Sequence, residues 1–135
     1  MAQVSVLVIL TNAREFVTSR LGGLLPEAVH TCDVEALIDT EHTPSVMPKW
    51  LARRLSLAWE RRETWRPDGR WGEAEVTELV QVEVFGRTAT IEALVMGKQV
   101  SLGATVLTST DLRWDATRGA FRPYLGTWEQ PVFRV

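Results

Sequence analysis

Side chains that could carry out acid–base chemistry are concentrated directly after an apolar stretch. Asp39 follows the apolar residues 36–38, and Glu41 and His42 lie within three positions of it. A carboxylate at the end of an apolar strand is costly to bury unless it is hydrogen-bonded or paired. Asp39 could simply turn the following loop by accepting backbone N–H groups, as aspartates in Asx motifs do. The alternative is a catalytic role, with a second carboxylate or with His42, whose unperturbed pKa suits base catalysis near neutrality.

Strand signals dominate the segments that must position these side chains. Alternating Val- and Ile-rich residues predict a strand over 3–10 and a second extended segment over 28–39, joined by a connection with at most two helical turns. Arg66-Pro67-Asp68-Gly69 is a turn signal, because proline fixes one φ and glycine supplies a positive one. The other predicted elements are hairpins over 60–65/71–78, 80–85/88–95 and 112–114/120–123, and short helices over 48–57 and 103–110. We therefore predict a single all-β domain over residues 1–135, with a barrel-like sheet and two short helices.

The order of four motifs resembles that of the retropepsin-like aspartic peptidases, in particular the small bacterial relatives of the retroviral proteases. The motifs are ALIDT (36–40), the TPSVMP exit (43–48), the Pro-Asp-Gly hairpin and VSLGATVL (100–107). The resemblance extends from about Val34 to Pro123, and the apolar-Asp-Thr triplet and the Ser-Leu-Gly helix entry are its strongest parts. It implies a closed antiparallel barrel with a flap hairpin and one or two short helices.

The resemblance also implies a mechanism in which two identical subunits each supply one aspartate. Asp39 matches that aspartate, and Thr40 matches the threonine that links the two loops across the two-fold axis. Like charges about 3 Å apart cannot both ionise, so the pair shares a proton. One carboxylate then activates a water as general base, while its protonated partner polarises the scissile carbonyl. The hairpin tip at Gly69 matches the flap that closes over a peptide substrate.

Three residues depart from the family pattern around this implied cleft. Glu41 and His42 occupy the positions of a glycine and a small residue, and Ser101 stands where the family carries an aliphatic side chain. Bulky polar groups at these positions intrude on the peptide groove, so peptidase activity is expected to be weak or absent. Trp65 and Trp71 flank the presumed flap tip, where they either pack across the hairpin or cover a substrate.

The same departures support the alternative hypothesis of a remade hydrolase or esterase, altered naturally or by engineering. His42 would act as general base for Ser101 or for a water. Glu41 or Asp39 would orient the imidazole, and the two tryptophans would cover an aromatic or ester substrate. A further alternative is a homodimeric scaffold without turnover. A metal site made by Asp39, Glu41 and His42 is disfavoured, because their spacing is too tight for one tetrahedral ion without ligands from a second subunit.

Composition argues against several other classes of protein. The formal net charge of −2 leaves no basic field for nucleic acid or an anionic membrane. No apolar run approaches the roughly 20 residues that span a bilayer. The opening MAQVSVLVIL has no basic n-region or cleavage site, so it predicts a strand and not a signal peptide. The single cysteine, Cys32, fits the cytoplasm, and we find no phosphate loop or other cofactor motif.

Overall fold

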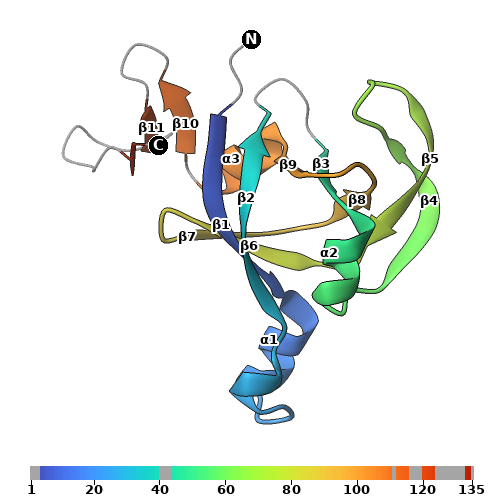
Figure 1. Cartoon of the computed structure of the whole chain (residues 1–135), viewed down its shortest axis with the longest axis vertical. Coiled ribbons are helices and arrows are strands. Elements are labelled where there is room, and N and C mark those ends of the chain that lie inside the picture. Colours follow the sequence, from blue (N-terminus) through green and yellow to red (C-terminus); the bar gives the residue numbers. More distant parts are fainter. Residues whose placement is uncertain (1–3, 40–43, 111, 116–119, 124–132, 135) are drawn as a thin grey trace.

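A computed structural model describes residues 4–39, 44–110, 112–115, 120–123 and 133–134. Strands are the main element of this part of the chain, and they form a nine-stranded sheet and a separate three-stranded sheet (Figure 1). The elements in chain order are β1 (Val4–Asn12), α1 (Ala13–Arg20), the 3-10 turn η1 (Pro26–Ala28), β2 (Thr31–Ile38), β3 (Ser45–Met47), α2 (Lys49–Arg54), β4 (Trp59–Trp65), β5 (Trp71–Thr77), β6 (Val80–Val84), β7 (Arg87–Ile91), β8 (Ala93–Val95), β9 (Val100–Leu102), α3 (Ala104–Ser109), β10 (Leu112–Asp115), β11 (Ala120–Pro123) and β12 (Phe133–Arg134). The β-rich fold expected from the sequence is confirmed.

The large sheet has the strand order β4-β5-β8-β3-β9-β2-β1-β6-β7. β1 pairs antiparallel with β2 along nearly its whole length and with β6 through its C-terminal part. Its side chains alternate, so that Val6, Val8 and Leu10 are buried whereas Ser5 and Leu7 are exposed. A period of two fixes which face of a strand turns inward. The sheet curls around that apolar face into a half-barrel (Figure 1).

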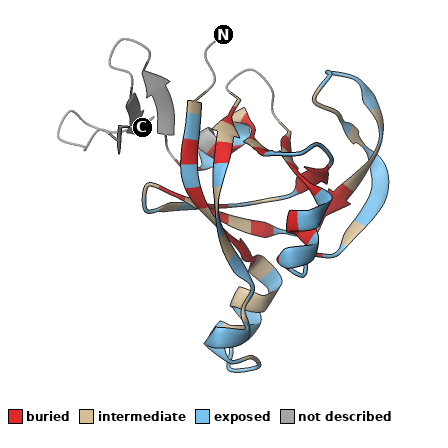
Figure 2. Cartoon of the chain, viewed as in Figure 1, coloured by how far each residue is buried: buried red, intermediate tan, exposed pale blue. Residues whose placement is uncertain are grey.

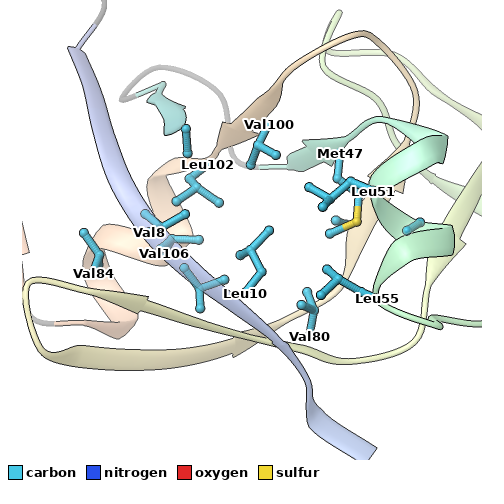
Figure 3. Close-up of a cluster of buried hydrophobic side chains, with 14 of the residues drawn as sticks. Val8, Leu10, Met47, Leu51, Leu55, Val80, Val84, Val100, Leu102 and Val106 are labelled. Atoms are coloured by element: carbon cyan, nitrogen blue, oxygen red, sulfur yellow. The ribbon is translucent and has the colours of Figure 1, made fainter. Parts of the chain in front are cut away.

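The hydrophobic core fills the inside of this curl, where the buried positions gather (Figure 2). Leu51 and Leu55 enter it from the α2 region and Val106 from α3, and they meet side chains of β1 and β9 (Figure 3). Burying each of these side chains contributes about 1.5–3 kcal/mol. The two short helices are therefore held by packing, because helices of this length have little stability of their own.

Two strand pairs in the large sheet are parallel. β2 pairs parallel with β9, and β3 pairs parallel with β8, whereas β3 and β9 are antiparallel. β9 thus lies between β2 and β3, two strands that are close in the sequence. Within the described residues, β4 and β7 stand at the two ends of the strand order, so the sheet is a half-barrel of mixed pairing there.

The helices differ in number and length from the sequence prediction. The connection after β1 contains α1, which gives three α-helices in the described part of the chain where two were expected. The helix predicted over 48–57 ends at Arg54. Ser56 takes φ +56°, a left-handed conformation that stops a helix. The helix predicted over 103–110 is present as α3, one residue shorter at each end.

The three predicted hairpins are present, with one change of register and one break. The second hairpin turns at Phe85 and Gly86, both with positive φ, as a two-residue type I′ turn requires. The strand predicted over 88–95 divides at Glu92 into β7 and β8, which pair with different neighbours.

Candidate functional site

Asp39 lies at the carboxyl end of β2, and its backbone is fixed by a neighbouring strand. Its N–H donates to the carbonyl oxygen of Leu102 at 2.9 Å, which extends the parallel β2–β9 ladder by one residue. Ala36 and Ile38 are buried, whereas Leu37 and Asp39 are half-buried. Strand alternation therefore puts Asp39 on the face of the sheet opposite to the core.

Ser101 lies on the same face, one strand away. It pairs with Leu37 across the parallel ladder and with Val46 across the antiparallel one, and all three side chains are half-buried. Its neighbours Val100 and Leu102 point into the core. The fold thus brings Asp39 and Ser101 to one surface, next to each other in strand order. The predicted roles of Thr40, Glu41 and His42 fall on residues outside the described part of the chain.

Ser45 joins the loop that follows Asp39 to the start of α3. Its hydroxyl oxygen accepts the N–H of Gly103 at 3.0 Å, and the residue is only 4% exposed. The sequence analysis did not single out this serine. A small hydroxyl residue at the start of an apolar strand is the signal that was available, because a buried hydroxyl needs a hydrogen-bond partner.

The β4–β5 hairpin has the turn that its sequence predicts. Its strands pair from Trp59 with Thr77 to Trp65 with Trp71. The N–H of Gly69 donates to the carbonyl of Arg66 at 2.9 Å, and Gly69 takes φ +79°. A Cβ built on Gly69 would meet nothing within 4 Å. The glycine is therefore required by the backbone conformation and not by lack of space.

Trp65 and Trp71 form a cross-strand pair at the base of this turn. Their ring centroids lie 5.4 Å apart with an interplanar angle of 76°, which is an edge-to-face arrangement. The indole N–H of Trp71 donates to Glu63 at 2.7 Å. Both rings remain more than half exposed. The packing interpretation thus accounts for their mutual contact, and their exposed surface is free to meet a ligand.

A pocket of about 400 Å³ opens beside the hairpin. It lies between the hairpin, the segment after the Asp39 loop, the β7–β8 corner and α3, and its lining includes Pro44, Ser45, Arg62, Thr64, Trp65, Val76, Ile91, Glu92, Leu94 and Thr105. Arg62 of β4 forms an ion pair with Glu92, which follows β7. No local pattern predicts this pair, because the two residues are 30 positions apart and come together through the pairing of β4 with β5 and of β5 with β8.

Glu78 forms hydrogen bonds that join the two ends of the β4–β5 hairpin, and it also pairs with Arg14 of α1. One of its oxygens accepts the N–H of Ala58 at 2.8 Å, and its own N–H donates to the carbonyl of Ala58 at 2.8 Å. The guanidinium of Arg14 donates to both carboxylate oxygens, at 2.9 and 3.3 Å. The hydrogen bond from Arg14 lowers the pKa of Glu78, and the same bond raises the pKa of Arg14. Glu78 therefore lies at the root of the hairpin and holds its two ends together.

Asn12 ties the start of α1 to the same region. Its side chain is fully buried, and its amide donates to the carbonyls of Leu55 and Ser56 at 3.1 Å each. The side-chain oxygen accepts the N–H of Glu15 and caps α1. The segment that leads into the hairpin is therefore held by buried hydrogen bonds on one side and by Glu78 on the other.

No protein-family model matches the chain, and no curated protein gives a significant match. Among the described residues, no group of three or more His, Cys, Asp or Glu side chains is placed to hold a metal ion. In the same part of the chain, no helix is both long and apolar enough to cross a bilayer. The chemistry that the site can support therefore follows from its own geometry.

Proposed function

We propose that the chain is a retropepsin-like aspartic peptidase homologue with an altered cleft, whose peptidase activity is weak or absent. The observation that carries this proposal is the hydrogen bond from Asp39 to Leu102. It holds a carboxylate-bearing residue at the end of β2, beside a parallel strand that leads through Gly103 into a short helix. A hairpin with a Pro-Asp-Gly tip and a pocket at its side complete the arrangement.

The proposed chemistry requires a homodimer, because one chain supplies one such aspartate. Two copies of Asp39 meet at the axis and share a proton, and Thr40 from each copy links the two loops. The dyad titrates as a unit and works on the acidic side, where one carboxyl is protonated and the other is ionised. The β4–β5 hairpin acts as the flap, hinged at Glu78 and Ala58. The substrate is a peptide in an extended conformation.

The proposal includes a barrel that is closed, and a cytoplasmic location. The curl of the described strands into a half-barrel supports closure, because it carries the sheet part of the way round its core. The single cysteine of the sequence supports the location, because proteins that act outside the cytoplasm more often carry paired cysteines.

Peptidase activity is low in this proposal because of the residues that follow the dyad. Glu41 replaces the glycine beside which the substrate backbone runs, and His42 fills a pocket that otherwise takes a side chain. The experiment is to make Glu41→Gly and His42→Ala together and to assay cleavage of a peptide library between pH 4 and 7. We expect cleavage that falls as the dyad ionises and that Asp39→Asn abolishes.

Two results would count against the proposal. Strong, pepstatin-sensitive cleavage by the unaltered chain would show that Glu41 and His42 do not obstruct the groove. Cleavage by the double variant that survives Asp39→Asn would remove the dyad from the mechanism. A chain that dimerises but turns over nothing in either form would instead match the non-catalytic scaffold.

A second candidate function is a hydrolase or esterase that uses His42 and Ser101. The observation that favours it is the position of Ser101, which is half-buried on the same face as Asp39 and not in the core. In this mechanism the imidazole of His42 takes the proton of Ser101 as the hydroxyl oxygen attacks an ester carbonyl. The alkoxide or phenoxide then leaves with that proton, and water hydrolyses the acyl-serine.

A further inference from the structure

The helix α1 presents apolar side chains that the fold does not cover. None of its eight residues is buried. Val17 is 55% exposed and Leu21, one turn further along, is 83% exposed. Residues at i, i+4 and i+8 share one side of a helix, so Ala13, Val17 and Leu21 form a stripe. The helix extends away from the large sheet (Figure 1).

Two members of this stripe, Ala13 and Val17, help to form one wall of a groove of about 600 Å³. Ala13, Phe16 and Val17 line it on the helix side, and Leu79, Gln81 and Thr90 line it on the sheet side. Leu79 is itself 51% exposed, at the corner between β5 and β6. Ligand sites are typically grooves of this volume, with apolar walls and a few polar groups.

Specific polar contacts fix the position of α1, which supplies one wall of the groove. The side chain of Asn12 caps α1 and binds the carbonyls of Leu55 and Ser56. At the far side of the helix, Glu15 accepts the backbone N–H of His30 at 2.8 Å and pairs with its ring at 2.9 Å. The helix is thus positioned without burying its apolar stripe, and the groove exists before any ligand arrives.

One end of the groove carries a guanidinium that a ligand can reach. Both oxygens of Glu78 are engaged, by Arg14 and by the N–H of Ala58. Arg14 uses its Nε and Nη2 atoms for Glu78, and its side chain is 57% exposed against 22% for Glu78. Arg14 and Glu78 both line the groove, and the guanidinium of Arg14 is the donor group there that favours a carboxylate acceptor.

We propose that this groove binds a small amphiphile with an apolar body and one terminal carboxylate, such as a medium-chain fatty acid. The carboxylate accepts hydrogen bonds from Arg14, and the apolar body lies against Phe16, Val17 and Leu79. The described lining of the groove contains no residue of β2, β9 or the segment after Asp39, and the inference does not rest on the proposed function.

The test uses the full chain with decanoate and decanol, below the concentrations at which either aggregates, followed by calorimetry and by amide NMR shifts. We expect saturable binding of one decanoate per chain, with shifts over residues 13–18 and 79–81, and weaker binding of decanol. Arg14→Gln should weaken decanoate binding about tenfold, toward the decanol value, and leave decanol binding unchanged.

Exposed apolar residues provide matched variants. Val17→Gln and Leu79→Gln should each weaken both ligands about tenfold or more, whereas Leu7→Gln, at an exposed leucine of β1, should change neither. Circular dichroism confirms that each variant is folded. Absence of saturable binding, equal affinity for decanoate and decanol, or equal effects of the Val17 and Leu7 changes would overturn the proposal. Binding seen only with neutral lipid vesicles would also overturn it, because the surface would then be a membrane contact.

Discussion

The N–H of Asp39 donates to the carbonyl of Leu102, so the carboxylate-bearing loop starts from a backbone that β9 holds in place. Leu102 is buried, and it is followed by Gly103, whose N–H is itself bound by Ser45. The segments on both sides of the loop are therefore anchored to one short stretch of chain. If the site meets its copy from a second subunit, as proposed, it benefits from such rigidity, because small displacements at a catalytic pair cost large factors in rate.

The first prediction concerns assembly and its dependence on pH. If two Asp39 carboxylates meet at the axis, the dimer holds a shared proton at acidic pH and two like charges at high pH. We expect the dimer dissociation constant, measured by sedimentation, to rise with pH in the unaltered chain. Asp39→Asn should flatten this dependence, because the amide carries no charge. A stable monomer at tens of micromolar would contradict the prediction.

The second prediction concerns the anchor at the root of the hairpin. Glu78→Gln should lower the free energy of unfolding at pH 7 by about 1 kcal/mol, since the ion pair with Arg14 is partly exposed and solvent screens it. The pKa of Glu78 is lowered in the folded state. Its contribution is therefore present above the unfolded pKa of about 4.3 and is lost as pH falls through the lower folded value.

Urea denaturation between pH 3 and 7 measures this effect. The stability difference between the unaltered chain and Glu78→Gln should shrink below about pH 4, as the carboxylate becomes protonated. Glu73→Gln is the matched control. The side chain of Glu73 is 60% exposed, and its carboxylate oxygen lies 3.7 Å from a guanidinium nitrogen of Arg61, so the ion pair is long and solvated. It should change stability little at any pH. Equal losses for the two variants would show that Glu78 is not a specific anchor.

The third prediction separates conformation from space in the hairpin. Gly69→Ala should destabilise the chain by about 1 kcal/mol, because alanine disfavours φ +79° even though its Cβ would meet no atom within 4 Å. Gly72→Ala is the control, since a Cβ there would lie at an ordinary 3.5 Å from Arg66 and its φ is not positive. Thermal unfolding of both variants tests the difference, and an equal or larger loss at Gly72 would refute it.

Local signals predicted the presence of the three hairpins and of β1. Pro67 and Gly69 determine a turn within four residues, and the alternation in β1 needs no knowledge of the rest of the chain. The same local reasoning allowed at most two helical turns in this connection and did not locate α1 there, because Gly22-Gly23 and Pro26 mark the segment as a loop and the helix has no buried stripe. Asn12 followed three residues later by Glu15 was the available signal of a helix start.

The candidate site depended on contacts that no local pattern contains. The parallel pairing of β2 with β9 brings Ser101 beside Leu37, and the pairing of β4 with β5 and of β5 with β8 brings Arg62 near Glu92. A resemblance to a known family could suggest the first contact, because it carries information on long-range pairing. Nothing in the sequence suggested the contact between Arg62 and Glu92. A charged residue that only faces solvent cannot be distinguished by sequence from one that forms an ion pair with a distant segment of the sheet.

The fourth prediction tests whether His42 is a base or an obstruction. If His42 activates Ser101 or a water, His42→Ala should reduce hydrolysis of an activated aryl ester by roughly 10²-fold or more. The rate in the unaltered chain should then rise through about pH 6–7 as the imidazole loses its proton. If His42 only obstructs the cleft, the substitution should leave ester hydrolysis unchanged or increase it. Rates measured from pH 5 to 8 decide between the two.

Ser101→Ala then determines whether the hydroxyl is the nucleophile. An acyl-serine intermediate that forms faster than it hydrolyses releases a burst of phenolate, and removing the hydroxyl should abolish that burst. Ser109→Ala is the matched control, because Ser109 is an exposed hydroxyl of α3 that lines the neighbouring pocket. A burst that persists in Ser101→Ala would exclude Ser101 and leave a water activated by His42. Loss of the burst in both variants would point to a general effect on the pocket.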